Sequence, residues 1–203
     1  PVVPGTKEPV FDVEIGMKEA EKIGYPVIVK ASSGGGGKGM RVVKDPNGFE
    51  FLFNVAQIES VNAFGDDTMY IEHFVENPRH IEIQIMADNF GNVVALGERD
   101  CSVQRNHQKL IEESPSPAIS EEVRKAMSRD AILAARTVGY TNAGTIEFIM
   151  GEDGSYYFME MNTRIQVEHG VTEMVTGIDL IVEQIRIAMG LPLSFSQEEI
   201  QLK

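Results

Sequence analysis

The chain is short of cysteine, of positive charge and of long apolar runs. Its single cysteine, Cys101, cannot form an intramolecular disulfide, which favours a reducing, cytoplasmic location. The 18 lysine and arginine residues face 31 aspartate and glutamate residues, which gives a formal net charge of -13. This charge argues against non-specific binding to nucleic acid or to an anionic membrane. Neither a signal peptide nor an apolar run of membrane length is apparent, so no membrane association is expected.

What the chain does contain is the composition of an ordinary globular protein. Of its 203 residues, 42% are hydrophobic and 24% are charged, which is enough for one core or two small lobes. The chain begins with Pro1 and not with methionine, and we expect it to be a piece of a longer protein.

Hydrophobic periodicity and turn residues predict an α+β fold in two parts. Residues 1–75 form a small first lobe and residues 76–203 a larger second lobe, linked near Glu76. Helices are expected at 11–23, 45–60, 120–139 and 177–189. Strands are expected at 25–30, 40–43, 68–75, 80–86, 93–98, 145–150 and 156–161. The segment 99–109 is polar and too rich in hydrogen-bonding groups for a core.

The first stretch with distinctive chemistry is Glu160–Glu168, in which every second residue is strongly polar. Alternate side chains of an extended chain share a face, so five polar groups would project together: Glu160, Asn162, Arg164, Gln166 and Glu168. A half-buried strand with a solvated polar face would show the same alternation. Two carboxylates, two amides and a guanidinium in one row nevertheless suit a metal ion and an anion better than water.

The second stretch is a run of glycines that ends at Gly39 and lies between two short apolar strands. Five glycines among six residues let backbone N–H groups approach an anion, as phosphate-binding loops do. A flexible linker is the plain alternative, but linkers seldom join two short strands. The P-loop pattern fails because no serine or threonine follows Lys38, and the kinase pattern fails because Lys30 precedes the loop. The run therefore indicates a nucleotide loop of another kind.

A predicted hairpin places a carboxylate on each of its two strands. The turn is expected to be two residues long, with Gly151 facing Gly154. Glu147 and Glu160 would then lie on the same sheet face in diagonally adjacent positions. Two carboxylates there would repel unless a cation lay between them, and Mg²⁺ or Mn²⁺ with phosphate oxygens is the matching hard ion. Asn162 shares the face and would complete the shell, whereas the plain alternative for Glu147 is an exposed strand carboxylate.

Several segments together resemble the ATP-grasp part of biotin carboxylases. They are spread over all 203 residues: Lys30–Arg41, Glu76–His80, Glu98–Ser102, Gln104–Arg105, His107–Lys109 and Glu160–Glu168. The resemblance implies an ATP-grasp fold, in which two α+β lobes with antiparallel sheets clasp the nucleotide. It also implies a ligase that makes carboxyphosphate from bicarbonate and MgATP and then carboxylates the N1 nitrogen of biotin. Such enzymes serve acetyl-CoA carboxylase in fatty acid biosynthesis, pyruvate carboxylase and their relatives.

The resemblance assigns nucleotide and metal roles to residues of both lobes. The implied ATP-binding residues are Lys30, Gly36, Gly37, Met40, Glu72, His73, Phe74, Val75, His80, Gln104, His107 and Ile149. Lys30 would neutralise phosphates, and Met40 and Ile149 would pack against the adenine. The implied ligands of Mg²⁺ or Mn²⁺ are Glu147, Glu160 and Asn162. Without the resemblance, His80 and His107 could equally be ordinary strand-end histidines.

The resemblance also assigns the reaction itself. The implied bicarbonate-binding groups are Lys109, Arg164, Gln166 and the Val167 amide. Arg164 would in addition stabilise anionic intermediates, and Glu168 would be the general base that takes the bicarbonate proton. Cys101 is interpreted as a small packed residue and not as a nucleophile.

The implied partners are a biotin carboxyl carrier protein or domain and a carboxyltransferase component. A homodimer of the full-length parent is left open. The family's N-terminal domain should precede Pro1 and more of its C-terminal domain should follow Lys203, so this core is expected to bind ATP but to turn over poorly. Two departures from the family pattern are His73, where lysine is usual, and Gly170, where proline is usual.

Two other functions stay open at this point. One is another ATP-grasp ligase, similar to carbamoyl phosphate synthetase. The other is a non-catalytic nucleotide-binding module, which would not need Arg164, Gln166 and Glu168 beside the metal residues.

Overall fold

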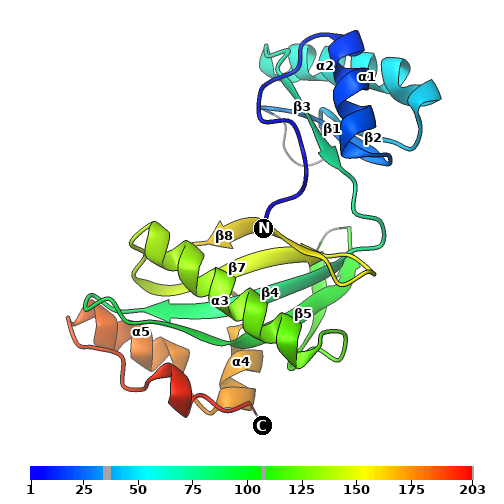
Figure 1. Ribbon diagram of the computed structural model, residues 1–203. Helices are drawn as coiled ribbons and strands as arrows, with labels where there is room; N and C mark the ends of the chain where they lie inside the picture. The colour runs from blue at the N-terminus through cyan, green and yellow to red at the C-terminus, as the bar shows by residue number, and fades with distance from the viewer. Residues whose placement is uncertain (34–37, 107, 203) are drawn as a thin grey trace. The chain divides into compact units, whose positions relative to one another are not determined.

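The computed structural model describes residues 1–33, 38–106 and 108–202, and the chain forms two compact units (Figure 1). The smaller unit spans Val2–Glu76, and the larger unit begins at Asn77 and also takes in Pro1. Pro1 joins the larger unit because its carbonyl oxygen accepts a 2.8 Å hydrogen bond from the N–H of Phe158. Each unit has its own sheet and its own hydrophobic core.

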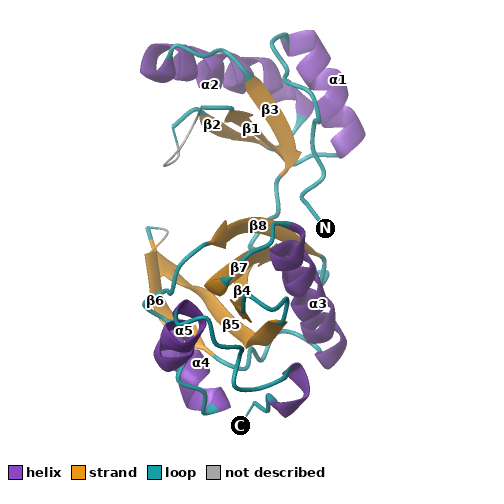
Figure 2. Ribbon diagram, turned by 90° about the vertical axis from the view of Figure 1, so that its left-hand side faces the viewer, coloured by secondary structure: helices purple, strands orange, loops and turns teal. Residues whose placement is uncertain are grey.

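The smaller unit is a three-stranded antiparallel sheet with two helices packed on it (Figure 2). The sheet has the order β2-β1-β3, formed by β1 (Val27–Ala31), β2 (Met40–Val43) and β3 (Met69–His73). The two helices are α1 (Val13–Ile23) and α2 (Phe49–Phe64), and the short 3₁₀ helix η1 (Pro46–Gly48) leads into α2. Val27 and Val29, alternate residues of β1, share one core with Phe49 and Phe53 of α2, as period-two burial requires.

The larger unit is a five-stranded antiparallel sheet with helices on both faces. The order is β6-β5-β4-β7-β8, formed by β4 (Arg79–Ala87), β5 (Val93–Arg105), β6 (Gln108–Glu113), β7 (Asn142–Met150) and β8 (Tyr156–Asn162). The helices are α3 (Glu121–Thr137), α4 (His169–Thr176), α5 (Leu180–Ala188) and the 3₁₀ helix η2 (Gln197–Glu199). This mixed architecture confirms the predicted α+β class. No helix in the described part of the chain is long and apolar enough to cross a membrane.

Alternation along β4 divides the larger unit into a packing face and a polar face. Ile81, Ile83 and Ile85 are fully buried in a cluster that includes residues of α3. The residues between them, Glu82 and Gln84, project to the opposite face, because successive strand side chains point in opposite directions. They are also fully buried. This sheet face therefore carries buried polar groups.

The segment 99–109, predicted to be too polar for a core, is mostly strand. β5 continues without interruption to Arg105, and Arg99, Asp100 and Cys101 are buried. The prediction was wrong for Arg99, Asp100 and Cys101, because the polar side chains of Arg99 and Asp100 find partners on neighbouring elements. The described residues from Ser102 to Lys109 are exposed or half-buried, as predicted. The helix predicted at 177–189 is shorter, since α5 begins at Leu180, where the Asp179 side chain accepts a hydrogen bond from the Val182 N–H.

The polar row is only partly a strand. β8 ends at Asn162, and the remainder of the row forms a loop that leads into α4. Alternation therefore applies to Glu160 and Asn162 alone. The later polar side chains are brought to the same place by the loop and not by strand periodicity.

Candidate active site

One pocket of about 740 Å³ in the larger unit gathers most of the predicted site residues. The predicted residues that line it are His80, Gln104, Lys109, Glu147, Ile149, Glu160, Asn162, Arg164, Gln166, Val167 and Glu168. They come from all five strands of the sheet and from the loop after β8. Segments up to 88 residues apart in the sequence, His80 to Glu168, thus share one concave site.

The carboxylates of this site are aligned in a row that crosses the sheet. Glu82 of β4 is directly opposite Arg99 of β5 on one side and Glu147 of β7 on the other. Glu147 is in turn directly opposite Glu160 of β8. Directly opposed residues of antiparallel strands point to the same face, so these four side chains share it.

The predicted hairpin geometry was wrong in detail. Phe148 pairs with Phe158, whereas Glu147 pairs with Glu160, so Met159 is an extra residue that forms a bulge. The turn is also longer than predicted, because the Gly151 N–H donates to the Ser155 carbonyl at 2.8 Å. The longer turn and the bulge each shift the pairing by one residue. Together they keep Glu147 and Glu160 on the same face but place them directly opposite each other instead of diagonally.

Lys109 is the centre of the charge network. Its Nζ lies 2.5 Å from Glu82 Oε2, 2.9 Å from Glu147 Oε1 and 2.6 Å from Glu168 Oε1. The lysine side chain is 19% exposed, so the ammonium is largely withdrawn from water. Burial favours the neutral amine, but hydrogen bonds to Glu168 and Glu82 outweigh it and raise the pKa of Lys109 above its ordinary value. Lys109 therefore stays a cation among three carboxylates.

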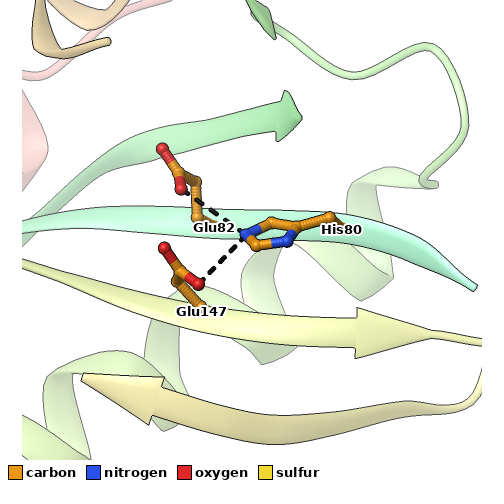
Figure 3. Close-up of side chains that lie close together, drawn as sticks. All are labelled: His80, Glu82 and Glu147. Atoms are coloured by element: carbon orange, nitrogen blue, oxygen red, sulfur yellow. Dashed lines mark ion pairs between the residues drawn. The ribbon is translucent and has the colours of Figure 1, made fainter. Parts of the chain in front are cut away.

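His80 is a second cation in the same network. Its Nε2 lies 3.2 Å from Glu147 Oε2 and 3.7 Å from Glu82 Oε2, between the two carboxylates in Figure 3. Burial disfavours the charged imidazole, but the Glu147 and Glu82 carboxylates overcome this effect and raise the pKa of His80 to about 9. The Gln104 amide nitrogen lies 3.3 Å from the other ring nitrogen, Nδ1.

Glu147 receives polar contacts on both of its oxygens. Oε1 accepts hydrogen bonds from Lys109 Nζ at 2.9 Å, Asn162 Nδ2 at 3.0 Å and Gln166 Nε2 at 3.0 Å. Burial works against ionisation, but His80 and Lys109 lower the pKa of Glu147 to about 2. The carboxylate is therefore ionised and held in a fixed orientation.

The loop after β8 presents the remaining candidate groups. Arg164 is exposed and its guanidinium lies 3.4 Å from Asn162 Oδ1, while the Gln166 side chain is 5% exposed. Val167 is almost fully exposed at 96%. Glu168 immediately precedes α4, and its carboxylate is held by Lys109. An exposed cation and a carboxylate held by Lys109 thus lie on either side of Gln166 and Val167 along the loop.

The donor set fits a hard divalent ion. Glu147 and Glu160 are opposed, Glu160 is exposed to solvent, and carboxylate oxygens are preferred ligands of Mg²⁺ and Mn²⁺. Because the Asn162 nitrogen donates to Glu147, its Oδ1 is the atom that could contribute to the same ion. His80, Glu82 and Glu147 also have ligand atoms within 4.8 Å of one another. Since Lys109 already binds both of these carboxylates, this second group is an ion-pair network.

The predicted nucleotide residues of the smaller unit lie on its three strands and in the segment that follows β3. Lys30 donates to both oxygens of Glu72, at 3.0 Å, and Met40 is the register partner of Lys30 on β2. The N–H groups of His73 and Phe74 donate to the carbonyls of Pro4 and Pro26. These two N–H groups are already hydrogen-bonded within the smaller unit, so an adenine edge would need other backbone groups of residues 72–75. Val75 is buried. Gly36, Gly37 and His107 lie outside the described residues.

Sequence reasoning missed a set of buried polar residues beneath the pocket. They are Glu82, Gln84, Arg99, Thr145 and Thr172. The alternation of Glu82 and Gln84 with isoleucines was visible, but a solvated strand face produces the same pattern. Arg99 carried no local signal, because its burial depends on partners from other elements.

Comparisons with known proteins agree with the resemblance to biotin carboxylases that the sequence shows. The model of the family "Carbamoyl-phosphate synthase L chain, ATP binding domain" matches residues 1–196. The biotin carboxylase of Nostoc sp. is 57% identical over 203 residues, which is 100% of this chain and 45% of that protein. The chain therefore spans less than half the length of this relative.

Solved structures of biotin carboxylases are also similar to this chain. A beta-gamma-ATP complex of biotin carboxylase from Campylobacter jejuni matches with a TM-score of 0.86 and 52% identity, covering 100% of this chain and 45% of that one. The biotin carboxylase domain of the Hydrogenobacter thermophilus 2-oxoglutarate carboxylase, in complex with MgADP, ADP and bicarbonate, matches with a TM-score of 0.85 and 49% identity over the same shares. The predicted ATP-grasp fold is confirmed by these likenesses.

Proposed function

The chain belongs to the ATP-grasp family of the carbamoyl-phosphate synthase L chain ATP-binding domain, with biotin carboxylases among its similar relatives, and from this premise we propose that it is the ATP-binding core of a biotin carboxylase. The proposed reaction is the ATP-dependent carboxylation of biotin, attached to a carrier protein, by bicarbonate through carboxyphosphate. The observation that carries the proposal is Lys109 held among three carboxylates beneath the loop of Arg164 and Gln166.

The two ends of the pocket suit the two halves of this chemistry. At one end, Glu147 and Glu160 would hold Mg²⁺ or Mn²⁺, which when bound would neutralise charge on the phosphates. At the other end, Lys109, Gln166, Arg164 and the Val167 amide offer cations and N–H donors to an anion the size of bicarbonate. The phosphoryl group would be transferred between these ends.

Glu168 is the proposed general base. Its carboxylate is 2.6 Å from Lys109 Nζ, and Lys109 is also the proposed bicarbonate ligand, so base and anion would share one anchor. The base would take the bicarbonate proton while a bicarbonate oxygen forms a bond to the γ-phosphorus and ADP leaves. Arg164, which is exposed at the rim, would stabilise the anionic carboxyphosphate and the deprotonated biotin.

The smaller unit is proposed to contribute to nucleotide binding. Lys30 would exchange its Glu72 contact for phosphate oxygens, and Met40 would pack against the adenine. His80, Gln104 and Ile149 of the larger unit line its pocket and are proposed as the nucleotide contacts of that unit. The Gly36, Gly37 and His107 contacts remain part of this proposal.

The proposed partners are a biotin carboxyl carrier protein or domain and a carboxyltransferase component. The single thiol, Cys101, is buried, which is consistent with the proposed reducing, cytoplasmic environment. Burial raises the pKa of the Cys101 thiol, so it is a packed side chain and not a nucleophile.

The test is biotin-dependent fixation of ¹⁴C-bicarbonate by the protein that carries this chain, with Glu168→Gln measured beside it. We expect fixation to require ATP and a divalent ion, and Glu168→Gln to lower kcat at least a hundredfold with little change in ATP affinity. Glu122→Gln, on the exposed surface of α3, is the matched control and should behave as the unaltered protein.

Two outcomes would reject the proposal. ATP cleavage that ignores biotin but yields carbamoyl phosphate with ammonia would assign the chain to another ATP-grasp ligase. Nucleotide binding without bicarbonate-dependent cleavage would make it a non-catalytic module.

A further inference from the structure

Arg99 lies in β5 with none of its side chain exposed, although its guanidinium is charged at every physiological pH. A buried guanidinium loses free energy for each N–H group that finds no acceptor. It does not line the pocket of about 740 Å³, and the resemblance to biotin carboxylases gave it no role. Its contacts therefore need an explanation of their own.

The five N–H groups of the guanidinium meet five oxygen atoms. Nε donates to Glu82 Oε1 at 2.5 Å. Nη1 donates to Gln84 Oε1 and to Thr172 Oγ1, both at 2.8 Å. Nη2 lies 3.3 Å from Thr145 Oγ1 and 3.5 Å from Gln166 Oε1. A planar fork with five donors fills this set, which the three donors of a lysine could not do.

The contact with Gln166 fixes which end of an amide faces the pocket. Because Oε1 is turned to the guanidinium, Nε2 is left to donate to Glu147 Oε1 at 3.0 Å. The flipped amide would oppose two donors on one side and two acceptors on the other. Arg99 thereby keeps the N–H donors of Gln166 on the side where an anion would bind.

Two further contacts reach the pocket through one intermediate each. Glu82 gives one oxygen to Arg99 and the other, at 2.5 Å, to Lys109. Thr172 stands one turn after Glu168, the residue that precedes α4. Arg99 thus contacts Gln166 directly, Lys109 through Glu82, and the helix that begins just after Glu168.

We propose that Arg99 is a positioning residue of the anion pocket, which orients the Gln166 amide and the Glu82 carboxylate so that Gln166 and Lys109 present donors to the bound anion. The inference rests on the proposed function in that the anion is bicarbonate. The inference goes beyond the proposed function because it assigns the orientation of the anion-binding groups to a residue outside the pocket.

The kinetic test compares Arg99→Lys with the unaltered protein that carries this chain. We expect the KM for bicarbonate to rise about tenfold while the KM for ATP stays within twofold, because loss of a well-placed donor to a charged group is of this size. Arg124→Lys is the matched control, since Arg124 also pairs with a fully buried carboxylate, Glu98, but away from the pocket. It should leave both KM values unchanged.

A double-mutant cycle separates positioning from a general loss of structure. If Arg99 acts through Gln166, Arg99→Lys should add little to the bicarbonate KM once Gln166→Ala is present. Additive effects on the bicarbonate KM would overturn the proposal. If Arg99→Lys does not fold, Thr172→Val removes one of the five acceptors instead and should raise the bicarbonate KM in the same direction. An unchanged KM in that variant would also overturn it.

A measurement without turnover makes the inference independent of the proposed activity. The side-chain NH₂ signals of Gln166, assigned in ¹⁵N-glutamine-labelled chain by their loss in Gln166→Ala, should exchange with solvent at least tenfold faster in Arg99→Lys. Unchanged exchange would show that Arg99 does not hold this amide. If the unaltered protein fixes no bicarbonate, the proposed function fails, and the exchange rates still decide the role of Arg99.

Discussion

Replacing Lys109 by methionine should destabilise the larger unit more than any surface charge would. The lysine contacts three carboxylates, Glu82, Glu147 and Glu168, which are 0%, 5% and 7% exposed. Methionine keeps most of the side-chain volume and removes the charge. The variant therefore tests the electrostatic role of Lys109 with little change in packing.

The size of the effect follows from the two most strongly perturbed carboxylates. Burial opposes ionisation, but neighbouring cations lower the pKa of Glu82 and that of Glu147 from 4.5 to about 2. Each shift corresponds to about 3 kcal/mol in favour of the ionised form in the folded chain. Lys109 shares this with His80 and Arg99, but removing one partner of a buried ion pair typically costs about 3–5 kcal/mol. We expect the free energy of unfolding to fall by about 3 kcal/mol at pH 7.

The pKa shifts also predict how the destabilisation by Lys109→Met changes with pH. In the unaltered chain these folded-state pKa values lie below the unfolded value, so their stabilisation is present above pH 4.5 and is lost as the pH falls through about 2. Without Lys109 the carboxylates repel one another and their pKa values rise. Protonation then relieves the repulsion at a higher pH than in the unaltered chain, so the deficit of Lys109→Met should shrink as the pH falls.

The assay is urea unfolding followed by far-ultraviolet circular dichroism, with hydrogen exchange of β4 and β7 to locate the loss in the larger unit. Lys125→Met is the control, because Lys125 is 75% exposed and lies 3.5 Å from Glu121 in a surface pair. It should unfold as the unaltered chain does. A Lys109→Met chain that is equally stable at pH 7, or whose deficit grows toward pH 5, would refute the reasoning.

Three further changes test other parts of the larger unit by the same unfolding assay. Phe148→Ala should lower the free energy of unfolding by about 4 kcal/mol, because its ring is 1% exposed and lies 5.6 Å from the ring of Tyr156; a loss below about 1 kcal/mol would contradict the core described above. His80 has a folded pKa of about 9 against 6.5, so its contribution of about 3 kcal/mol is complete below pH 6.5 and is lost as the pH rises through 9. His80→Gln should accordingly flatten the loss of stability between pH 7 and 9.5, and an unchanged slope would argue against a charged His80. Gly144→Ala should cost about 1–3 kcal/mol, since the added methyl would lie 2.8 Å from the Tyr140 ring; a neutral substitution would show that the ring moves freely.

Much of this architecture can be predicted from local pattern. The alternation of β4, β7 and β8 is visible in the sequence, and it puts Glu160 and Asn162 on one face because side-chain direction in a strand depends only on parity. The caps are equally local: Ser120 accepts a hydrogen bond from the Val123 N–H at the start of α3.

Alternation within one strand does not predict how that strand pairs with the next one across a turn. A two-residue turn at Gly151 was the simplest prediction, but a longer turn and a bulge at Met159 are equally compatible with the sequence. Their sum decides whether Glu160 faces Glu147 directly or diagonally, and no local residue preference settles that sum. The fold class survives such an error, whereas the geometry of a metal pair does not.

Burial of a charged residue is not a local property at all. Arg99 looked too polar for a core because strand and helix patterns weigh each residue by itself. Its partners lie 15 to 73 residues away in the sequence, on β4, β7, α4 and the loop before α4. Only the assembled sheet brings five acceptors to one guanidinium.

The bulge at Met159 also sets where this hairpin can change in length. A residue gained or lost in the exposed tip, between Gly151 and Ser155, falls where the chain already reverses and leaves the pairing beyond the bulge in place. If Met159 entered the regular ladder instead of bulging, every later side chain of β8 would turn to the other face, and Glu160 would be directed away from Glu147. Insertions and deletions among relatives should therefore accumulate at the tip, where a change of length leaves the direction of Glu160 unchanged.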